Sequence, residues 1–196
     1  MNDLSRPQNW GLQVPLCRQS YSALNWVGGA SLFAVPPLWR GWLSANQSLT
    51  AQLKKLSAGD FRVELLRQEI AQPHADERSQ LNLAPRQLAM IREVLLYGCG
   101  RPWVLARTVV PLATLSGPLA HLRRLGTRPL GEALFAQRSL QRSGFEFADC
   151  RNLHFEVPAH YGRRSRFTVA QRPLLVAEIF LEPFLEKIKD KEESIA

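Results

Sequence analysis

The sequence has few cysteines and no arrangement of them that would define a disulfide framework. There are 3 cysteines among 196 residues, at Cys17, Cys99 and Cys150, an odd number without paired spacing. Neither a disulfide-stapled secreted domain nor a thiolate metal site is indicated by such a pattern. We therefore expect the protein to work in a reducing compartment, the cytoplasm.

Motifs that hold metals, phosphates or activated serines are also missing from the sequence. The 4 histidines lie in no H-E-x-x-H or comparable ligand spacing, so metal catalysis has no sequence support. The sequence contains no G-x-S-x-G elbow and no G-x-x-x-x-G-K loop. Its one G-x-G, Gly98 to Gly100, is followed by Arg-Pro-Trp rather than by a helical pattern, so it does not indicate dinucleotide binding.

No hydrophobic run is long enough to span a membrane. The most apolar stretch near the N-terminus, Ala23 to Leu38, is interrupted by Gly28-Gly29 and Pro36-Pro37. A membrane-spanning helix needs about 20 apolar residues. The chain also lacks a basic start and a cleavage context at its N-terminus. We expect a soluble protein without stable membrane insertion.

The charge is strongly positive but is not arranged as in proteins that bind nucleic acid. A formal charge of +8 and a pI near 10.0 suit nucleic acid, an anionic membrane surface or a small anion. The arginines occur in twos and threes along the chain, without zinc-finger spacing or a basic motif interleaved with aromatic residues. The pattern therefore disfavours nucleic acid as a partner.

Length and composition predict one domain with extensions. A chain of 196 residues with 45% hydrophobic content is long enough to enclose a single core. Residues 1–30 show no sustained period and are expected to form an N-terminal extension. Residues 31–185 are expected to form the domain, and residues 186–196 a charged C-terminal tail.

The first half of this domain mixes helical and extended patterns. From Pro36 to Leu56 the apolar spacing predicts helices, two rather than one, with Ser48 as a cap or break between them. Alternation over Phe61 to Leu66 predicts a half-buried strand. The polar stretch Gln72 to Pro85 is expected to be either a mobile flap or a plain solvated loop.

Hairpins and short helices are predicted for the remainder. Ala89–Tyr97 and Trp103–Val110 form a predicted hairpin around a glycine-containing turn. Short helices are expected within Thr114–Gly126, with Ser116 as cap, and again up to Phe135. Three further strands are expected at 144–148, 165–169 and 174–181. The pattern favours an α+β fold, a single antiparallel sheet with helices packed on it.

Charged side chains interrupt three of the apolar strands. Arg92 shares a strand face with Val94 and Leu96, Arg107 lies among apolar neighbours in the next strand, and Glu178 lies within PLLVAEIFL. A buried charge costs several kcal/mol, to order of magnitude, unless a partner meets it. These residues predict either an internal pocket for an anionic ligand or a structural Arg–Glu ion pair, and the pattern leaves both open.

A second group of arginines has a simpler interpretation. Arg163, Arg164 and Arg166 are close in sequence, a pattern more typical of a solvated sheet edge than of a ligand site. Their alternation places Arg164 and Arg166 on the same face.

Several motifs, in order, resemble the chorismate pyruvate-lyases of bacterial ubiquinone synthesis. They are IREVLLYGCGRPWVLARTVVP, TLSGP, LRRLGTRPLGEALF, YGRRSR and PLLVAEIFL, and the resemblance covers about Pro36 to Leu181. It implies a cofactor-free, monomeric lyase that converts chorismate to 4-hydroxybenzoate and pyruvate. It also implies an antiparallel sheet with helices and an internal site closed by flaps.

The resemblance also assigns roles to individual residues. The carboxylate-binding arginine of the family falls on Arg92, its hydroxyl-binding glutamate on Glu178, and a leucine whose backbone contacts the product carboxylate on Leu130. A methionine contact of the family falls on Leu49 in QSLT, where the chain departs from the pattern. For the second carboxylate of chorismate we considered Arg107, and then Arg164, each with an ion pair in the fold as the alternative.

Two other functions are compatible with the resemblance. One is a non-catalytic small-molecule sensor, because the ligand-binding domains of one group of transcription regulators are similar in fold. Such sensors normally follow a DNA-binding helical domain, and the first thirty residues are too few for one. The other is a relative that forms 3-hydroxybenzoate.

Overall fold

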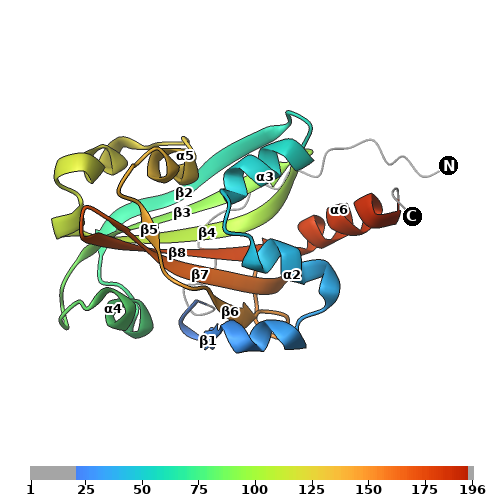
Figure 1. Ribbon diagram of the computed structural model, residues 1–196, viewed down its shortest axis with the longest axis horizontal. Coiled ribbons are helices and arrows are strands. Elements are labelled where there is room, and N and C mark those ends of the chain that lie inside the picture. Colours follow the sequence, from blue (N-terminus) through green and yellow to red (C-terminus); the bar gives the residue numbers. More distant parts are fainter. Residues whose placement is uncertain (1–20, 194–196) are drawn as a thin grey trace.

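One antiparallel β-sheet forms the centre of the protein. The computed structural model describes residues 21–193, and within them the sheet has eight strands. The strands are β1 (Val27–Gly28), β2 (Phe61–Ala71), β3 (Ala89–Gly98), β4 (Arg101–Pro111), β5 (Gln141–Arg142), β6 (Glu146–Asp149), β7 (Ala159–Val169) and β8 (Arg172–Leu181). Their order is β1-β6-β7-β8-β4-β3-β2, and β5 pairs with β7 beside β6 (Figure 1). The predicted α+β class with a single antiparallel sheet is confirmed.

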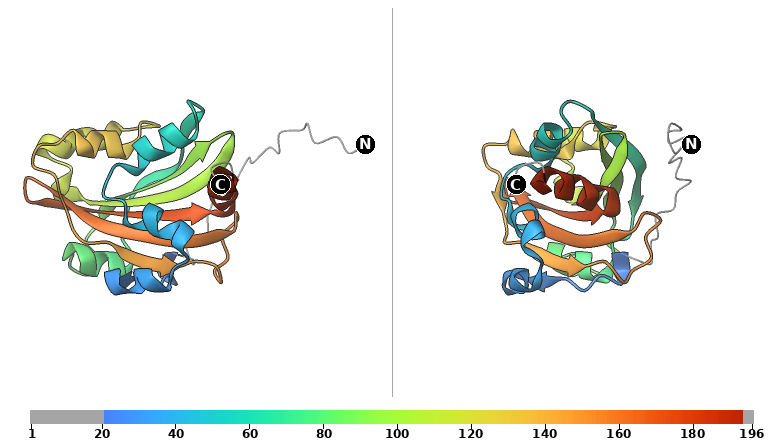
Figure 2. Two further views of the ribbon diagram at one scale, coloured as in Figure 1. Left: turned by 45° about the vertical axis from the view of Figure 1, so that its right-hand side comes forward. Right: turned by 90° about the vertical axis from the view of Figure 1, so that its right-hand side faces the viewer.

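Helices lie on both faces of the sheet. They are η1 (Gly29–Ala34), α2 (Pro37–Ser44), α3 (Leu49–Leu56), α4 (Ala75–Leu81), η2 (Leu112–Thr114), η3 (Gly117–Arg124), α5 (Leu130–Phe135) and α6 (Glu182–Glu193). Seen along the strands, the sheet curves around α2, α3 and α6, while α4 lies on the other side (Figure 2). Buried residues of α2, α3 and α6 share one hydrophobic cluster with the sheet. The concave face therefore carries most of the helical cover.

Two tight hairpins set the register of the central strands. The turn between β3 and β4 has positive φ at Cys99 and Gly100, and the turn between β7 and β8 has positive φ at Ala170 and Gln171. Two successive positive φ angles are the geometry of a type I′ turn, whose twist matches that of the flanking strands. Both hairpins were predicted from the sequence and are confirmed.

The period-two alternation of the central strands separates two cores. Val94, Leu96 and Phe180 face the concave side, in the cluster that includes α2, α3 and α6. Leu95 and Ile179, their neighbours in sequence, face the opposite side. Charged residues follow the same rule, so each arginine on β3, β4 or β7 is assigned to a face by its position in the strand.

The helical segment after Pro36 is divided into two helices, as predicted. Ser48 precedes α3, and its hydroxyl accepts a hydrogen bond from the backbone N–H of Ala51. Leu43 of α2 and Leu53 of α3 are fully buried. Such a cap typically contributes about 1 kcal/mol to helix stability, and here it fixes where α3 begins.

The stretch Gln72 to Pro85 is not a plain solvated loop, because it contains α4. The helix begins after His74, whose backbone N–H donates to the Glu77 carboxylate at 2.9 Å. Glu77 and Leu81 are buried against the convex face of the sheet. The prediction of a plain loop was wrong because α4 is short and is held mainly by ion pairs, which leave no apolar periodicity in the sequence.

The packed body extends past both expected domain boundaries, at 30 and 185. Tyr21 and Leu24 are buried in the convex-face core, and α6 runs through position 185 with Phe184 and Ile188 buried in the concave-face core. Residues 1–20 of the expected extension and residues 194–196 of the expected tail lie outside the described part. Within the described part, no helix has both the length and the apolar character needed to cross a membrane.

Candidate functional site

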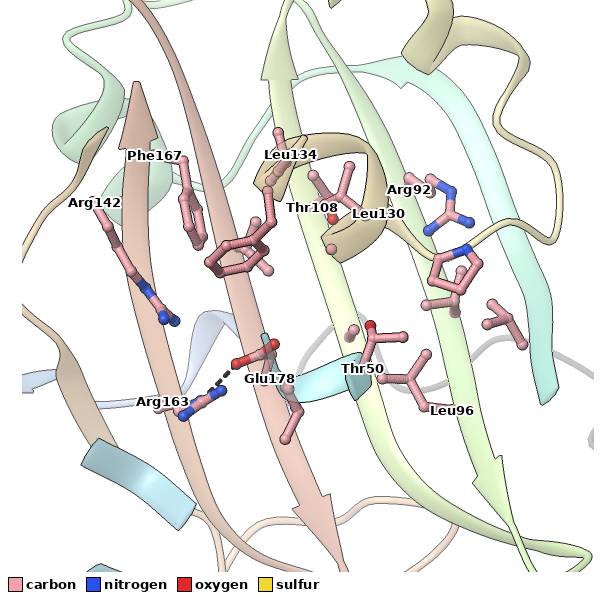
Figure 3. Close-up of a pocket in the computed structure, with 18 of the residues that line it drawn as sticks. Thr50, Arg92, Leu96, Thr108, Leu130, Leu134, Arg142, Arg163, Phe167 and Glu178 are labelled. Atoms are coloured by element: carbon pink, nitrogen blue, oxygen red, sulfur yellow. Dashed lines mark hydrogen bonds and ion pairs between the residues drawn. The ribbon is translucent and has the colours of Figure 1, made fainter. Parts of the chain in front are cut away.

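A pocket lies on the concave face of the sheet, below α3 and α5. Strands β3, β4, β7 and β8 form its floor (Figure 3). Apolar side chains that line it from the floor strands are Val94, Leu96, Ala106, Phe167 and Val176, and those from the two helices are Leu49, Leu130, Leu134 and Phe135. Its polar lining residues are Gln47, Thr50, Thr108, Arg92, Arg142, Arg163 and Glu178. An apolar cleft with a few convergent polar groups is the usual form of a small-molecule site.

Arg92 is buried in this pocket, and no carboxylate of residues 21–193 forms an ion pair with it. Its side chain is only 2% exposed, and its Nη2 donates to the carbonyl oxygens of Gly126 at 2.8 Å and Arg128 at 3.2 Å. Its Nε has no hydrogen-bond partner within the described chain. Burial lowers the pKa of Arg92 to about 10. A guanidinium that is desolvated and incompletely bonded is suited to bind an anion.

Glu178 lines the same pocket from β8. Its side chain is 14% exposed, and its Oε2 accepts a hydrogen bond from Arg163 Nε at 2.6 Å. The sequence left open an Arg–Glu ion pair, and in the structure Glu178 forms it with Arg163 rather than with Arg92. Arg92 binds backbone carbonyls on one side of the pocket, and Glu178 binds Arg163 on the other (Figure 3).

Arg163 is the residue on which sequence reasoning failed most clearly. It was expected at a solvated sheet edge, but its exposed fraction is 0% and it lies on β7, between β8 and the β5–β6 side of the sheet. Its Nη1 donates to the carbonyls of Trp42 at 2.7 Å and Ala45 at 3.1 Å, at the end of α2. Arg163 thus ties α2 to Glu178, and its Nη2 keeps no partner among the described residues.

Leu49 and Leu130, the two residues that the family resemblance assigned to the site, both line the pocket, and each is the first residue of its helix. The N-termini of α3 and α5 approach each other closely: a Cβ on Gly131 would lie 3.0 Å from Ser48 Oγ and 3.1 Å from Thr50 Oγ1. Glycine at position 131 permits this approach. The first N–H groups of a helix have no intrahelical acceptor, so both helix starts direct positive partial charge toward the pocket.

Arg107 and Arg164 are not part of this pocket. Arg107 is 3% exposed on the convex face, where its Nε and Nη2 bond Glu77 at 2.6 and 2.9 Å and its Nη1 bonds Glu93 at 2.5 Å. Arg164 bonds Glu146 and Asp76 on the same face. Each arginine was expected either to bind the second carboxylate of the substrate or to form an ion pair within the fold. The structure places both arginines in ion pairs.

Arg142 is a pocket residue that the sequence gave no reason to select. It lies on β5, a strand of two residues, which is too short to show a period. Its Nε donates to Ser165 Oγ at 2.8 Å, and its Cζ lies 3.9 Å from the centre of the Phe145 ring. Burial lowers its pKa to about 10, with Glu178 opposing this shift and Arg163 adding to it.

The fold and the pocket define a class of ligand-binding α+β proteins, and sequence comparison identifies the family. A profile of the family described as chorismate lyase matches residues 21–191. A probable chorismate pyruvate-lyase of Methylococcus capsulatus is 42% identical over 74% of this chain and 94% of its own length. A chorismate pyruvate-lyase of Pectobacterium atrosepticum is 40% identical over 71% of this chain and 75% of its own length. The chain therefore belongs to the chorismate lyase family.

A solved structure confirms the fold alone. The effector domain of PhnF from Mycobacterium smegmatis aligns with a TM-score of 0.51 over 70% of this chain and 90% of its own length, at 12% identity. At that identity the likeness concerns the arrangement of strands and helices, and it carries no information about the ligand.

Proposed function

We propose that this protein is a chorismate pyruvate-lyase, which converts chorismate to 4-hydroxybenzoate and pyruvate and so supplies ubiquinone biosynthesis. Family membership and the names of its relatives support this activity. The observation that carries it structurally is that Arg92 and Glu178, far apart in sequence, line one apolar pocket from β3 and β8. The pocket thus offers a cation and a carboxylate on different sides of one apolar space (Figure 3).

The reaction is an elimination that needs no oxidant and no reductant. The ether bond between ring carbon C3 and the enolpyruvyl oxygen breaks, and C4, which bears the hydroxyl group, loses its hydrogen. The ring becomes aromatic, and the enolpyruvyl fragment gains a proton on its methylene carbon to become pyruvate. Because aromatisation supplies the driving force, the protein accelerates the step mainly by holding a reactive conformer. We propose that it uses no cofactor.

Arg92 is the proposed ligand of the ring carboxylate. Its Nε has no partner among the described residues, and the first residues of α3 and α5, Leu49 and Leu130, line the same pocket. A carboxylate there would bond the guanidinium and approach the unpaired backbone N–H groups of the helix starts. This arrangement fits a contact through the backbone, so a leucine at position 49 can serve where relatives have methionine.

Glu178 is the proposed acceptor for the 4-hydroxyl, which is para to the ring carboxylate. Arg163 holds the Glu178 carboxylate through one oxygen, Oε2, and leaves Oε1 for the substrate. Two routes for the C4 hydrogen fit this geometry: transfer through Glu178, or direct transfer to the enolpyruvyl methylene. Turnover in D₂O separates them, because the first route brings solvent deuterium into the methyl group of pyruvate and the second does not.

Substitutions at the two residues test the assignment. We expect Arg92→Gln to reduce both kcat/KM for chorismate and affinity for 4-hydroxybenzoate by about 100-fold, the effect of losing a charge-assisted hydrogen-bonded pair. Glu178→Gln should lower kcat more than it raises KM, because it keeps the shape of the side chain and loses its charge. Wild-type turnover in both variants would contradict these roles.

We also propose a cytoplasmic monomer that does not bind nucleic acid. Arg67, Arg107, Arg163 and Arg164 all form ion pairs within the fold, so these four guanidinium groups are already engaged and do not add to a phosphate-binding surface. Within the described residues, Cys99 and Cys150 are both free thiols, as in a reducing compartment. Light scattering on a sizing column and retention on a DNA column at low salt test these two properties.

A further inference from the structure

Two arginines, Arg142 and Arg163, lie near a single carboxylate, Glu178, at one side of the pocket. Arg142 on β5 points toward Glu178 and Arg163, whereas Arg92 lies across the pocket (Figure 3). The guanidinium groups of Arg142 and Arg163 both lie on the ring of Phe145, with Cζ at 3.9 and 4.9 Å from its centre. Glu178 bonds only Arg163 of these two. This side of the pocket therefore carries one uncompensated positive charge.

Arg142 is held in place by contacts that leave most of its hydrogen-bond donors free. Its Nε bonds Ser165 Oγ, and the rings of Phe145 and Phe167 pack on its guanidinium. No Asp or Glu carboxylate of residues 21–193 forms an ion pair with it. Burial without such a partner is what lowers its pKa to about 10. The side chain is thus fixed and desolvated before any ligand arrives, which reduces the entropic cost of binding.

Arg163 provides a second, independent indication of a missing ligand. The side chain has no solvent exposure, and yet its Nη2 has no acceptor in the described structure. A buried donor without a partner costs about 1–3 kcal/mol, so this nitrogen requires an acceptor from outside the described chain, either a water molecule or a ligand. This atom belongs to a residue that lines the pocket beside Glu178.

The charges of the pocket match those of a doubly charged substrate. Arg92, Arg142 and Arg163 contribute three positive charges and Glu178 one negative charge, which leaves two positive charges uncompensated. Chorismate carries two carboxylates, one on ring carbon C1 and one on the enolpyruvyl group at C3. With C1 directed to Arg92 and the C4 hydroxyl at Glu178, the C3 substituent is adjacent to the hydroxyl and therefore close to the Glu178 side of the pocket.

We propose that Arg142, together with Nη2 of Arg163, binds the enolpyruvyl carboxylate of the substrate. This assignment rests on the proposed lyase function and extends it to the second carboxylate. It replaces Arg107 and Arg164, which the sequence offered for this role and which bond glutamate and aspartate on the other face of the sheet. The subsite distinguishes substrate from aromatic product, because 4-hydroxybenzoate has no group that reaches it.

The test compares a ligand that carries a second carboxylate, in a carboxymethoxy group at C3, with one that has only hydrogen at C3. One is 4-hydroxybenzoate, and the other is 3-(carboxymethoxy)-4-hydroxybenzoate, a stable diacid that carries a carboxylate on the C3 oxygen. Calorimetric binding of both is measured for the wild type, for Arg142→Gln, and for Arg138→Gln. Arg138 is an exposed residue shortly before β5, so its substitution controls for the loss of one positive charge outside the pocket.

We expect Arg142→Gln to weaken diacid binding by about 100-fold and to leave 4-hydroxybenzoate binding within about threefold, because a hydrogen-bonded charge pair of this kind is worth a factor of about 10 to 150. KM for chorismate should rise in parallel, and Arg138→Gln should behave as wild type. Arg142→Lys keeps the charge and loses the paired N–H donors of the guanidinium, so its affinity for the diacid should lie between those of the wild type and Arg142→Gln. If Arg142→Gln does not fold, the same ratio measured on Arg142→Lys decides.

Equal weakening of both ligands, or no weakening of either, would overturn the assignment of Arg142. Failure of the lyase function would be seen separately, as absence of turnover by the wild type. The diacid and monoacid affinities do not depend on turnover, so the subsite is tested in either case.

Discussion

Replacing Arg107 tests whether the buried charges on the convex face of the sheet stabilise the fold, while substrate binds on the concave face. It bonds Glu77 of α4 through two nitrogens and Glu93 of β3 through a third, and all three residues are buried. Arg107→Met removes the charge and keeps much of the volume. Glu77 is then left in the core without its main partner, and Glu93 keeps only Arg67, which bonds it at 2.9 Å. Breaking a buried pair by removing one partner costs about 3–5 kcal/mol.

The expected cost converts into a large change in melting temperature. For a domain of this size each kcal/mol lowers Tm by about 2–4 °C, so Arg107→Met should melt roughly 6–20 °C below the wild type. The matched control is Arg67→Met, which also removes a partner of Glu93. Arg67 is partly exposed, and of its two carboxylate partners Glu69 is exposed and Glu93 is buried, so its loss should cost less than the loss of Arg107, both of whose partners are buried.

Thermal unfolding followed by circular dichroism, with steady-state kinetics measured below the transition, separates stability from substrate binding. We expect Arg107→Met to lose stability and to keep KM for chorismate within about threefold when folded, because its guanidinium lies on the face away from the pocket. A variant with unchanged Tm and a KM raised tenfold or more would refute the reasoning, since it would make Arg107 a substrate ligand.

Three further predictions concern the fold. Gly98→Ala should lower the free energy of unfolding, measured in urea, by about 1–3 kcal/mol, because the new Cβ would lie 2.1 Å from the Trp103 ring. The control is Gly144→Ala, whose Cβ would meet nothing within 4 Å and which should change the free energy of unfolding by less than about 0.5 kcal/mol. Gly41→Ala, in exposed helix with no atom near the new Cβ, should stabilise by about 0.5–1 kcal/mol; a loss would contradict the helix. Burial alone would raise the pKa of Glu77, but its arginine partner outweighs this and lowers it. The resulting stabilisation is present above the unfolded pKa, about 4.3, and is lost as pH falls through the folded pKa. Glu77→Gln should therefore flatten the acid limb of stability against pH, and an unchanged slope would exclude this carboxylate as its source.

The central strands and two of the pocket charges could be predicted because local pattern determines them. β3 and β4 are long, apolar and joined by a two-residue turn at Cys99-Gly100, so their pairing follows from sequence. Arg92 and Glu178 interrupt apolar strands, so burial could be inferred from their immediate neighbours. The resemblance to a known family then supplied the expectation that these two residues meet.

The other pocket residues could not be predicted because their partners are distant in sequence. Arg163 belongs to a run of arginines, which resembles a solvated edge, and its burial is supported by backbone carbonyls of α2 and by Glu178. Arg142 lies on a two-residue strand, and its environment depends on β7 and on Phe145. Charge density along the chain carries no information about which arginines find acceptors in the folded protein.

The burial of α4 illustrates the same limit on the opposite face. Its seven residues contain a single large apolar side chain that packs inward, Leu81, and are otherwise polar. Its attachment depends on Glu77 and Asp76, which meet Arg107 and Arg164 from β4 and β7. Charged residues that are exposed and charged residues that are buried in ion pairs can have the same sequence pattern. Only the tertiary contacts distinguish them.

The most direct test of the lyase function is the stoichiometry of the reaction with purified protein. Chorismate is incubated with the wild type, 4-hydroxybenzoate is quantified by chromatography, and pyruvate is quantified by its coupled reduction with lactate dehydrogenase. The account predicts that the two products form in equal amounts, at a rate far above that of chorismate alone, and that Glu178→Gln abolishes most of this rate. No product above the uncatalysed background, or 3-hydroxybenzoate in place of the 4-isomer, would contradict it.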